Sequence, residues 1–153
     1  MHRRTLVLAG GCAPVLAWAH HGWSSFDPDR PVWLEGRAQR VKWQNPHVEF
    51  ELERTQAGVP ADLASRSYPA QSARVDGAAL AAKATAPTRQ DRIWTVELAP
   101  LSRMNAWKVQ EIKPGDTVGI LGFTFKEEKG DPLIRAEFLF VRGQVYGLRS
   151  GPA

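Results

Sequence analysis

His47-Val48-Glu49-Phe50-Glu51-Leu52-Glu53 decides the fold class, because apolar and polar residues alternate along it without a break. Alternation with a period of two is the pattern of a strand with one face on a core and the other toward solvent. Val48, Phe50 and Leu52 are therefore expected to point inward. His47 is expected on the outer face with the three glutamates, about 7 Å from Glu49 along the strand. The stretch predicts a β protein.

Other segments extend this prediction in both directions along the chain. In residues 32–43 the apolar side chains change face near Gly36, which indicates a long strand with a bulge or bend. Residues 26–31 hold two prolines and are expected to form a turn before that strand. Further strands are expected over 93–98, 117–125 and 133–141, the last extended by 143–146, and a helix over 101–112 that Ser102 could cap.

The order strand, strand, strand, helix, strand, strand predicts an all-β fold with one short helix. It is the order of a small five-stranded antiparallel barrel of the OB type. Gly36, Gly119 and Gly122 suit the sharp corners of such a barrel. Residues 54–92 interrupt the pattern, because large hydrophobic residues almost vanish there. We expect a disordered loop insertion at about 54–92, within a single OB-like domain that spans 20–148.

The first residues carry the features of an export signal. Residues 1–19 combine a basic start, an apolar segment and the small-residue site Ala17-Trp18-Ala19, so cleavage is expected before His20. Arg3-Arg4 also resembles a twin-arginine signal, and Cys12 leaves open a lipoprotein in which His20 is internal. The apolar segment is too short to span a membrane. We therefore expect a periplasmic protein without a transmembrane segment.

Charge and cysteine content exclude several classes of function. The net charge is +4, and the basic residues are scattered among acidic ones rather than gathered in a stripe. Nucleic acid is therefore not expected as a partner. The only cysteine, Cys12, lies in the signal, so a mature chain has neither a disulfide nor a thiol nucleophile. The expected partner is a periplasmic protein or a small ligand, and the oligomeric state stays open.

Several short motifs follow one another in a characteristic order. They are His20-His21-Gly22-Trp23 with Phe26-Asp27, Glu35-Gly36-Arg37-Ala38, Trp43-Gln44-Asn45-Pro46-His47, Trp94-Thr95-Val96-Glu97 and Lys113-Pro114-Gly115-Asp116-Thr117-Val118. In this order they resemble a family of small exported bacterial proteins of unknown function. That family has a His-His-Ser-Phe amino terminus and a Trp-x-Asn-Pro-His motif. The resemblance implies export and a fold, but no activity.

The histidines form the sharpest candidate site. Cleavage before His20 would free an amine that chelates a metal ion together with the imidazole of the same residue, and His47 or His21 would supply a third nitrogen. Imidazole nitrogens in tetragonal geometry suit Cu(II), with zinc as the second choice. Asp27 or Glu49 would complete the shell or orient an imidazole.

Two other classes of function remain open from the sequence. An OB-like barrel without a metal can bind a ligand or a protein on an exposed aromatic face, and Trp43, Trp94 and Asn45 are the candidate residues. Tryptophans in so small a barrel also serve as core. An enzyme is less favoured: the glutamates of 47–53 and Glu97 could act as acid and base, but no nucleophilic triad, phosphate loop or dinucleotide fingerprint is present.

Overall fold

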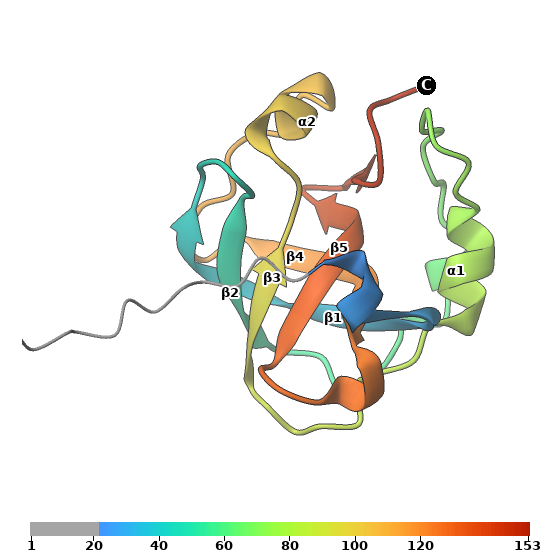
Figure 1. The fold of residues 1–153 in the computed structure, drawn as a ribbon, viewed down its shortest axis with the longest axis vertical. Coiled ribbons are helices and arrows are strands. Elements are labelled where there is room, and N and C mark those ends of the chain that lie inside the picture. The colour runs from blue at the N-terminus through green and yellow to red at the C-terminus, as the bar shows by residue number, and fades with distance from the viewer. Residues whose placement is uncertain (1–21) are drawn as a thin grey trace, which may run out of the picture.

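Residues 22–153 are described in the computed structural model of the chain, and the expected signal segment, His20 and His21 lie outside them. The fold is mostly β (Figure 1). Its strands are β1 (Phe26–Lys42), β2 (Glu49–Arg54), β3 (Ile93–Glu97), β4 (Thr117–Phe125), β5 (Leu133–Val141) and β6 (Gln144–Gly147). Its helices are α1 (Gly77–Lys83) and α2 (Leu101–Ala106), with short 3-10 turns η1 (Trp23–Ser25), η2 (Leu63–Ser65) and η3 (Lys126–Glu128). No helix among the described residues is long and apolar enough to cross a membrane.

The strands are hydrogen-bonded in the order β3-β2-β1-β4-β5-β6, and β3 also pairs with β5. A ring of hydrogen bonds therefore runs through five strands, with β6 attached outside it. The closing pair β3–β5 is parallel, whereas the other pairs are antiparallel. The predicted antiparallel β arrangement is thus confirmed for the pairs along the ring, and the ring closes through one parallel pair. A closed ring with an odd number of strands cannot alternate direction everywhere, so at least one pair has to be parallel.

β1 is the long strand that links both sides of the ring. It pairs with β4 from Phe26 to Arg37 and with β2 from Gly36 to Lys42, so Gly36 has partners on both sides. A Cβ at Gly36 would lie 2.0 Å from the backbone oxygen of Glu53, which explains why the smallest residue stands there. The register shift falls between Gln39 and Lys42, later than the expected bend near Gly36.

The expected turn over 26–31 is instead the first part of β1. Proline is tolerated there because the β1–β4 register shifts between the pairs Phe26–Phe125 and Pro31–Phe123. A bulge leaves residues outside the ladder, where a missing backbone donor costs little.

The main core fills the inside of the ring. Val48, Phe50 and Leu52 are buried there, as the alternation predicted, and they join Trp94 and Ile120. Alternation thus identified the inward face of β2 correctly.

A second apolar layer covers the outer face of β1, β4 and β5. Trp33, Leu121, Phe138 and Phe140 point outward from these strands and meet Leu63 of η2. Residues 54–92 are therefore not a structureless loop, and α1 lies beside the first half of β1 (Figure 1). The few large side chains of this segment are enough to attach it to the sheet, because they pack against an apolar sheet surface.

Backbone pairing adds to this attachment. Val32 forms a bridge with Thr85, with Trp33 N–H donating to Thr85 O at 3.0 Å and Thr85 N–H donating to Pro31 O at 3.0 Å. A second bridge joins Gln71 to Pro152 near the carboxyl end. Backbone pairing thus joins the segment to β1 and to the carboxyl-terminal tail.

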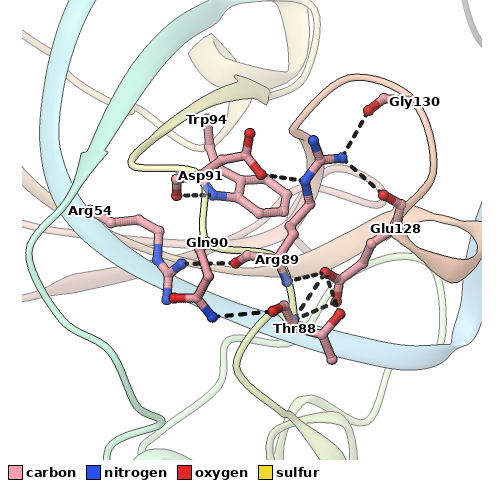
Figure 2. A network of polar contacts seen from close by, with 8 residues as sticks. All are labelled: Arg54, Thr88, Arg89, Gln90, Asp91, Trp94, Glu128 and Gly130. Atoms are coloured by element: carbon pink, nitrogen blue, oxygen red, sulfur yellow. Dashed lines mark hydrogen bonds and ion pairs between the residues drawn. The ribbon is translucent and has the colours of Figure 1, made fainter.

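A polar network fastens the end of the 54–92 segment to the loop between β4 and β5 (Figure 2). The Glu128 carboxylate accepts hydrogen bonds from Thr88 N–H at 3.0 Å, the Thr88 hydroxyl at 2.9 Å and Arg89 N–H at 3.0 Å. The guanidinium of Arg89 donates to Glu128 O at 2.9 Å and to Gly130 O at 2.8 Å. Arg30 of β1 forms an ion pair with Glu128 at 2.8 Å. These contacts join three separate parts of the chain.

Two elements near the carboxyl half differ from expectation. The helix expected over 101–112 ends at Ala106, because the following Lys108 adopts a left-handed conformation with φ +54°. The N-cap residue of α2 is Pro100, so Ser102 does not cap this helix. Residues 144–147 do not extend β5: they fold back on it as β6 after Gly143, whose φ is +73°.

Candidate functional site

A pocket of about 280 Å³ opens beside His47. The pocket is formed by the residues before β2, the end of β3, part of β5 and the residues before β1. We call the residues before β1 the amino-terminal arm. We call the pocket the His47 pocket, and its polar and aromatic lining consists of Trp23, His47, Glu97, Arg103 and Arg135, with Gly22 at the arm.

His47, Glu97 and Arg135 form one electrostatic group in this pocket. Nδ1 of His47 lies 3.8 Å from Oε1 of Glu97. Arg135 donates to the same oxygen from Nε at 2.9 Å and approaches it with Nη2 at 2.7 Å. Glu97 and Arg135 are both buried. Removing them from water is costly unless they are paired, so each orients the other and together they present a fixed carboxylate to His47.

Trp23 is held between two guanidinium groups at the edge of the pocket. The guanidinium carbons of Arg135 and Arg149 lie 4.8 Å and 4.6 Å from the centroid of its ring. Arg135 also lies 4.3 Å from the ring centroid of Phe26. Such cation–π contacts attract by about 0.5–1 kcal/mol at exposed sites and more when desolvated. Trp23 keeps 48% of its surface exposed, so these contacts rather than burial fix the arm.

The second guanidinium is oriented by a buried carboxylate. Arg149 donates from Nε to Oε2 of Glu137 at 2.9 Å, and Glu137 has no exposed surface. Burial raises the pKa of Glu137, while the hydrogen bond from Arg149 and the charges of Arg149 and Arg103 oppose that rise without cancelling it. Oε1 of Glu137 has no hydrogen-bond partner among residues 22–153.

Of the predicted metal ligands, the structure describes His47, Asp27 and Glu49. His47 lies in the pocket, but Glu49 is directed to Lys42 at 4.0 Å and Asp27 accepts a hydrogen bond from Asp29 N–H at 3.1 Å. Neither acid lines the His47 pocket. His20 and His21 lie outside the described residues. Within residues 22–153, no group of three or more His, Cys, Asp or Glu side chains is arranged to hold a metal ion.

The three residues predicted to form an aromatic ligand-binding face differ in exposure. Trp94 is only 1% exposed and donates its indole N–H to Asp91 O at 3.0 Å. Trp43 packs against the main core with part of its surface exposed. Asn45 uses Oδ1 to accept the N–H of Leu101, the first residue of α2, at 3.1 Å. The prediction for Trp94 is therefore wrong, because a ring inside the main core cannot stack on a ligand.

The outer carboxylates of β2 are engaged with cations or amides. Glu51 forms an ion pair with Arg40 at 2.9 Å, and Glu53 accepts from the Gln39 amide at 2.6 Å. Arg92 also contacts Glu53. Their arrangement is that of cross-strand pairs on a solvated face, which contribute modestly to sheet stability.

Sequence reasoning missed Trp23 and Arg135 as site residues and weighed Glu97 only as an acid or base. The position of Glu97 near His47 follows from the register of β2 and β3, in which Glu49 is the direct partner of Glu97. Both carboxylates thus leave the same face, and Glu97 is the one that approaches His47. That register cannot be derived from the sequence, because the long 54–92 segment separates the two strands.

Comparison with known proteins agrees with the resemblance noted above. A family described as a family of unknown function (DUF6152) matches residues 9–65, which is less than half of the chain. The matched part includes the amino-terminal arm, β1, His47 and β2. No curated protein and no solved structure matches the chain.

Proposed function

We propose that this chain is an exported, OB-like binding protein of the periplasm that holds one copper ion. The ligands are the amine and imidazole of His20, freed by signal cleavage, together with His47. The ring order with its parallel β3–β5 closure supports the OB-like part of the proposal, since an OB barrel closes its five strands through its third and fifth.

The observation that carries the metal proposal is that the arm and His47 share one pocket. Gly22 and Trp23 line the His47 pocket, and Trp23 is held there by Arg135 and Arg149. His20 is two residues before Gly22, and two residues of chain span at most about 7 Å. This short link supports the proposal that His20 and His47 bind the same metal ion.

The donor set favours copper. Two imidazoles and an amine offer nitrogen ligands, which suit Cu(II) in tetragonal geometry, and zinc is the second choice. Glu97 takes the orienting role first given to Glu49, because it lies 3.8 Å from Nδ1 of His47. A carboxylate on the Nδ1 side leaves Nε2 as the ligand nitrogen and fixes the orientation of the ring.

The test is a titration of protein that begins at His20 with Cu(II) and, separately, with Zn(II). His47→Ala is expected to weaken Cu(II) binding at least about tenfold, and Gln44→Ala, an exposed change in the same turn, is expected to leave it unchanged. Equal affinity of His47→Ala and the unaltered protein would contradict the proposed site. Electron paramagnetic resonance of the Cu(II) form should count the nitrogen ligands, with one nitrogen fewer in His47→Ala.

A further inference from the structure

A second and larger cavity lies at the outer face of the sheet, between β1, β4 and residues 66–69. Its volume is about 810 Å³, within the range of small-molecule sites. We call it the outer cleft. β1, the start of β4, the turn between β5 and β6, and residues 66–69 form its walls. It shares no lining residue with the His47 pocket.

The floor of the outer cleft is aromatic and covered by a cation. Trp33 and Phe140 meet edge to face, with ring centroids 5.1 Å apart. The guanidinium carbon of Arg66 lies 5.6 Å from each of the two centroids. Gly119 makes room for this floor, since a Cβ there would lie 2.4 Å from the Trp33 ring. The guanidinium thus rests over an aromatic surface instead of extending into solvent.

Arg66 is held in place from one side only. Asp62 accepts from Nε at 3.0 Å and from Nη2 at 3.1 Å, which occupies one fork of the guanidinium. Within residues 22–153, Nη1 has no hydrogen-bond partner. A guanidinium has five donors in a fixed plane, so the second fork stays free for another planar acceptor. Arg142, the other arginine of the cleft, is already engaged with Gln110 O, Glu111 O and Asp116.

The cleft also holds unused polar groups. The hydroxyls of Ser67 and Thr117 and the amide of Gln144 line it without a hydrogen bond inside the described part of the chain. In the floor, Trp33 is 2% exposed, and its indole N–H has no partner among residues 22–153. A buried donor without a partner costs free energy, and in native proteins such groups usually have a role.

We propose that the outer cleft binds a small organic carboxylate with a flat apolar body. The carboxylate accepts from the free fork of Arg66, which favours a planar bidentate acceptor over a point charge or a neutral group. The apolar body extends from the carboxylate toward the walls at Pro69 and Val145, and the rim hydroxyls and amide contact its polar edge. This site is independent of the copper proposal.

Binding of indole-3-acetate and benzoate, each against its neutral amide, tests this inference on protein that begins at His20. The readouts are the indole N–H signals in a nitrogen-15 correlation spectrum and the shift in melting temperature. We expect both carboxylates to move an indole signal in a saturable way, and the amides to bind at least about tenfold more weakly, since a charge-assisted pair is lost. Equal binding of acid and amide, or no response to either acid at millimolar concentration, would overturn the proposal.

Three variants locate the site. Arg66→Gln is expected to weaken carboxylate binding about tenfold or more, while Arg66→Lys, which keeps the charge without the fork, is expected to recover only part of it. Arg74→Gln, an exposed arginine of the same segment, serves as the control and should bind normally. Thr117→Trp at the exposed start of β4 fills the cleft and should abolish binding without a change in Arg66. Normal binding by Arg66→Gln or by folded Thr117→Trp would rule out this location.

Discussion

The guanidinium carbon of Arg135 lies 4.8 Å from the centroid of the Trp23 ring, although the two residues come from opposite halves of the chain. Arg135 is itself paired with the buried carboxylate of Glu97, whose Oε1 lies 3.8 Å from Nδ1 of His47. Trp23, Arg135, Glu97 and His47 therefore form a continuous series of contacts. This series links the position of the amino-terminal arm to the orientation of the histidine.

Trp23→Ala tests whether that link positions the arm. We expect Cu(II) affinity to fall at least about tenfold, because the arm loses its cation–π contacts with Arg135 and Arg149. Trp23→Phe should retain part of the affinity, since a ring remains between the guanidiniums. The melting temperature should change little, because Trp23 is 48% exposed. Unchanged Cu(II) affinity in Trp23→Ala would show that the arm is positioned by other contacts.

Glu128→Gln is expected to destabilise the protein by about 1–3 kcal/mol at pH 7, because a buried network loses its charged acceptor. Burial by itself raises the pKa of Glu128, but the hydrogen bonds from Thr88 and Arg89 and the charge of Arg30 outweigh it and hold the pKa below its ordinary value. The stabilisation is therefore present above the pKa of the unfolded chain and is lost as the pH falls through the lowered folded pKa. Urea unfolding at pH 7 and pH 3 should show a penalty that shrinks at the lower pH. A penalty independent of pH would count against this account.

Glu137→Gln should behave in the opposite way. The pKa of Glu137 is raised by burial, so its contribution to stability is full below the unfolded pKa and declines as the pH rises through the folded pKa. The glutamine variant has no such decline. We therefore expect its stability relative to the unaltered protein to improve from pH 5 to pH 8, measured by urea unfolding at both values. A constant or worsening difference would contradict the raised pKa.

Leu63→Ala tests whether residues 54–92 are part of the folded domain. Leu63 is 1% exposed and packs into the layer that contains Trp33 and Phe138. We expect a loss of about 2–5 kcal/mol in the free energy of unfolding, as for other large-to-small changes in a core. Arg74→Ala, an exposed change in the same segment, should have little effect. A loss below about 0.5 kcal/mol for Leu63→Ala would mean that the segment adds little to the fold.

The sequence allowed the positions of β1 to β5 along the chain and much of the inner core to be predicted. β4 and β5 carry nearly continuous apolar runs, and Val48, Phe50 and Leu52 alternate, so their burial follows from local pattern. The second apolar layer was not predicted, although the apolar runs of β4 and β5 indicated it. A strand that is apolar on both faces needs to be covered on each face. Residues 54–92 supply part of this layer, but their low apolar content did not indicate that they pack on the sheet.

The site was predicted less completely than the fold. His47 was identified because its position at the start of an alternating strand is visible in the sequence. Its neighbours Glu97 and Arg135 come from β3 and β5, and their positions depend on cross-strand register and on the parallel closure of the ring. Register is set by turns and by the buried face of each strand, and a long segment between β2 and β3 leaves it undetermined. The outer cleft was not predicted either, because Trp33 and Phe140 of the second apolar layer form its floor.

The most direct test of the copper proposal is a Cu(II) titration of two proteins that differ by one residue at the amino terminus. One protein begins at His20, and the other carries a single methionine before His20. A control protein begins at His20 and carries a single methionine after Ala153. Because the extension moves the free amine away from the His20 imidazole, we predict Cu(II) affinity at least about tenfold lower in the extended protein and unchanged in the control. Equal Cu(II) affinity in all three proteins would contradict the proposal.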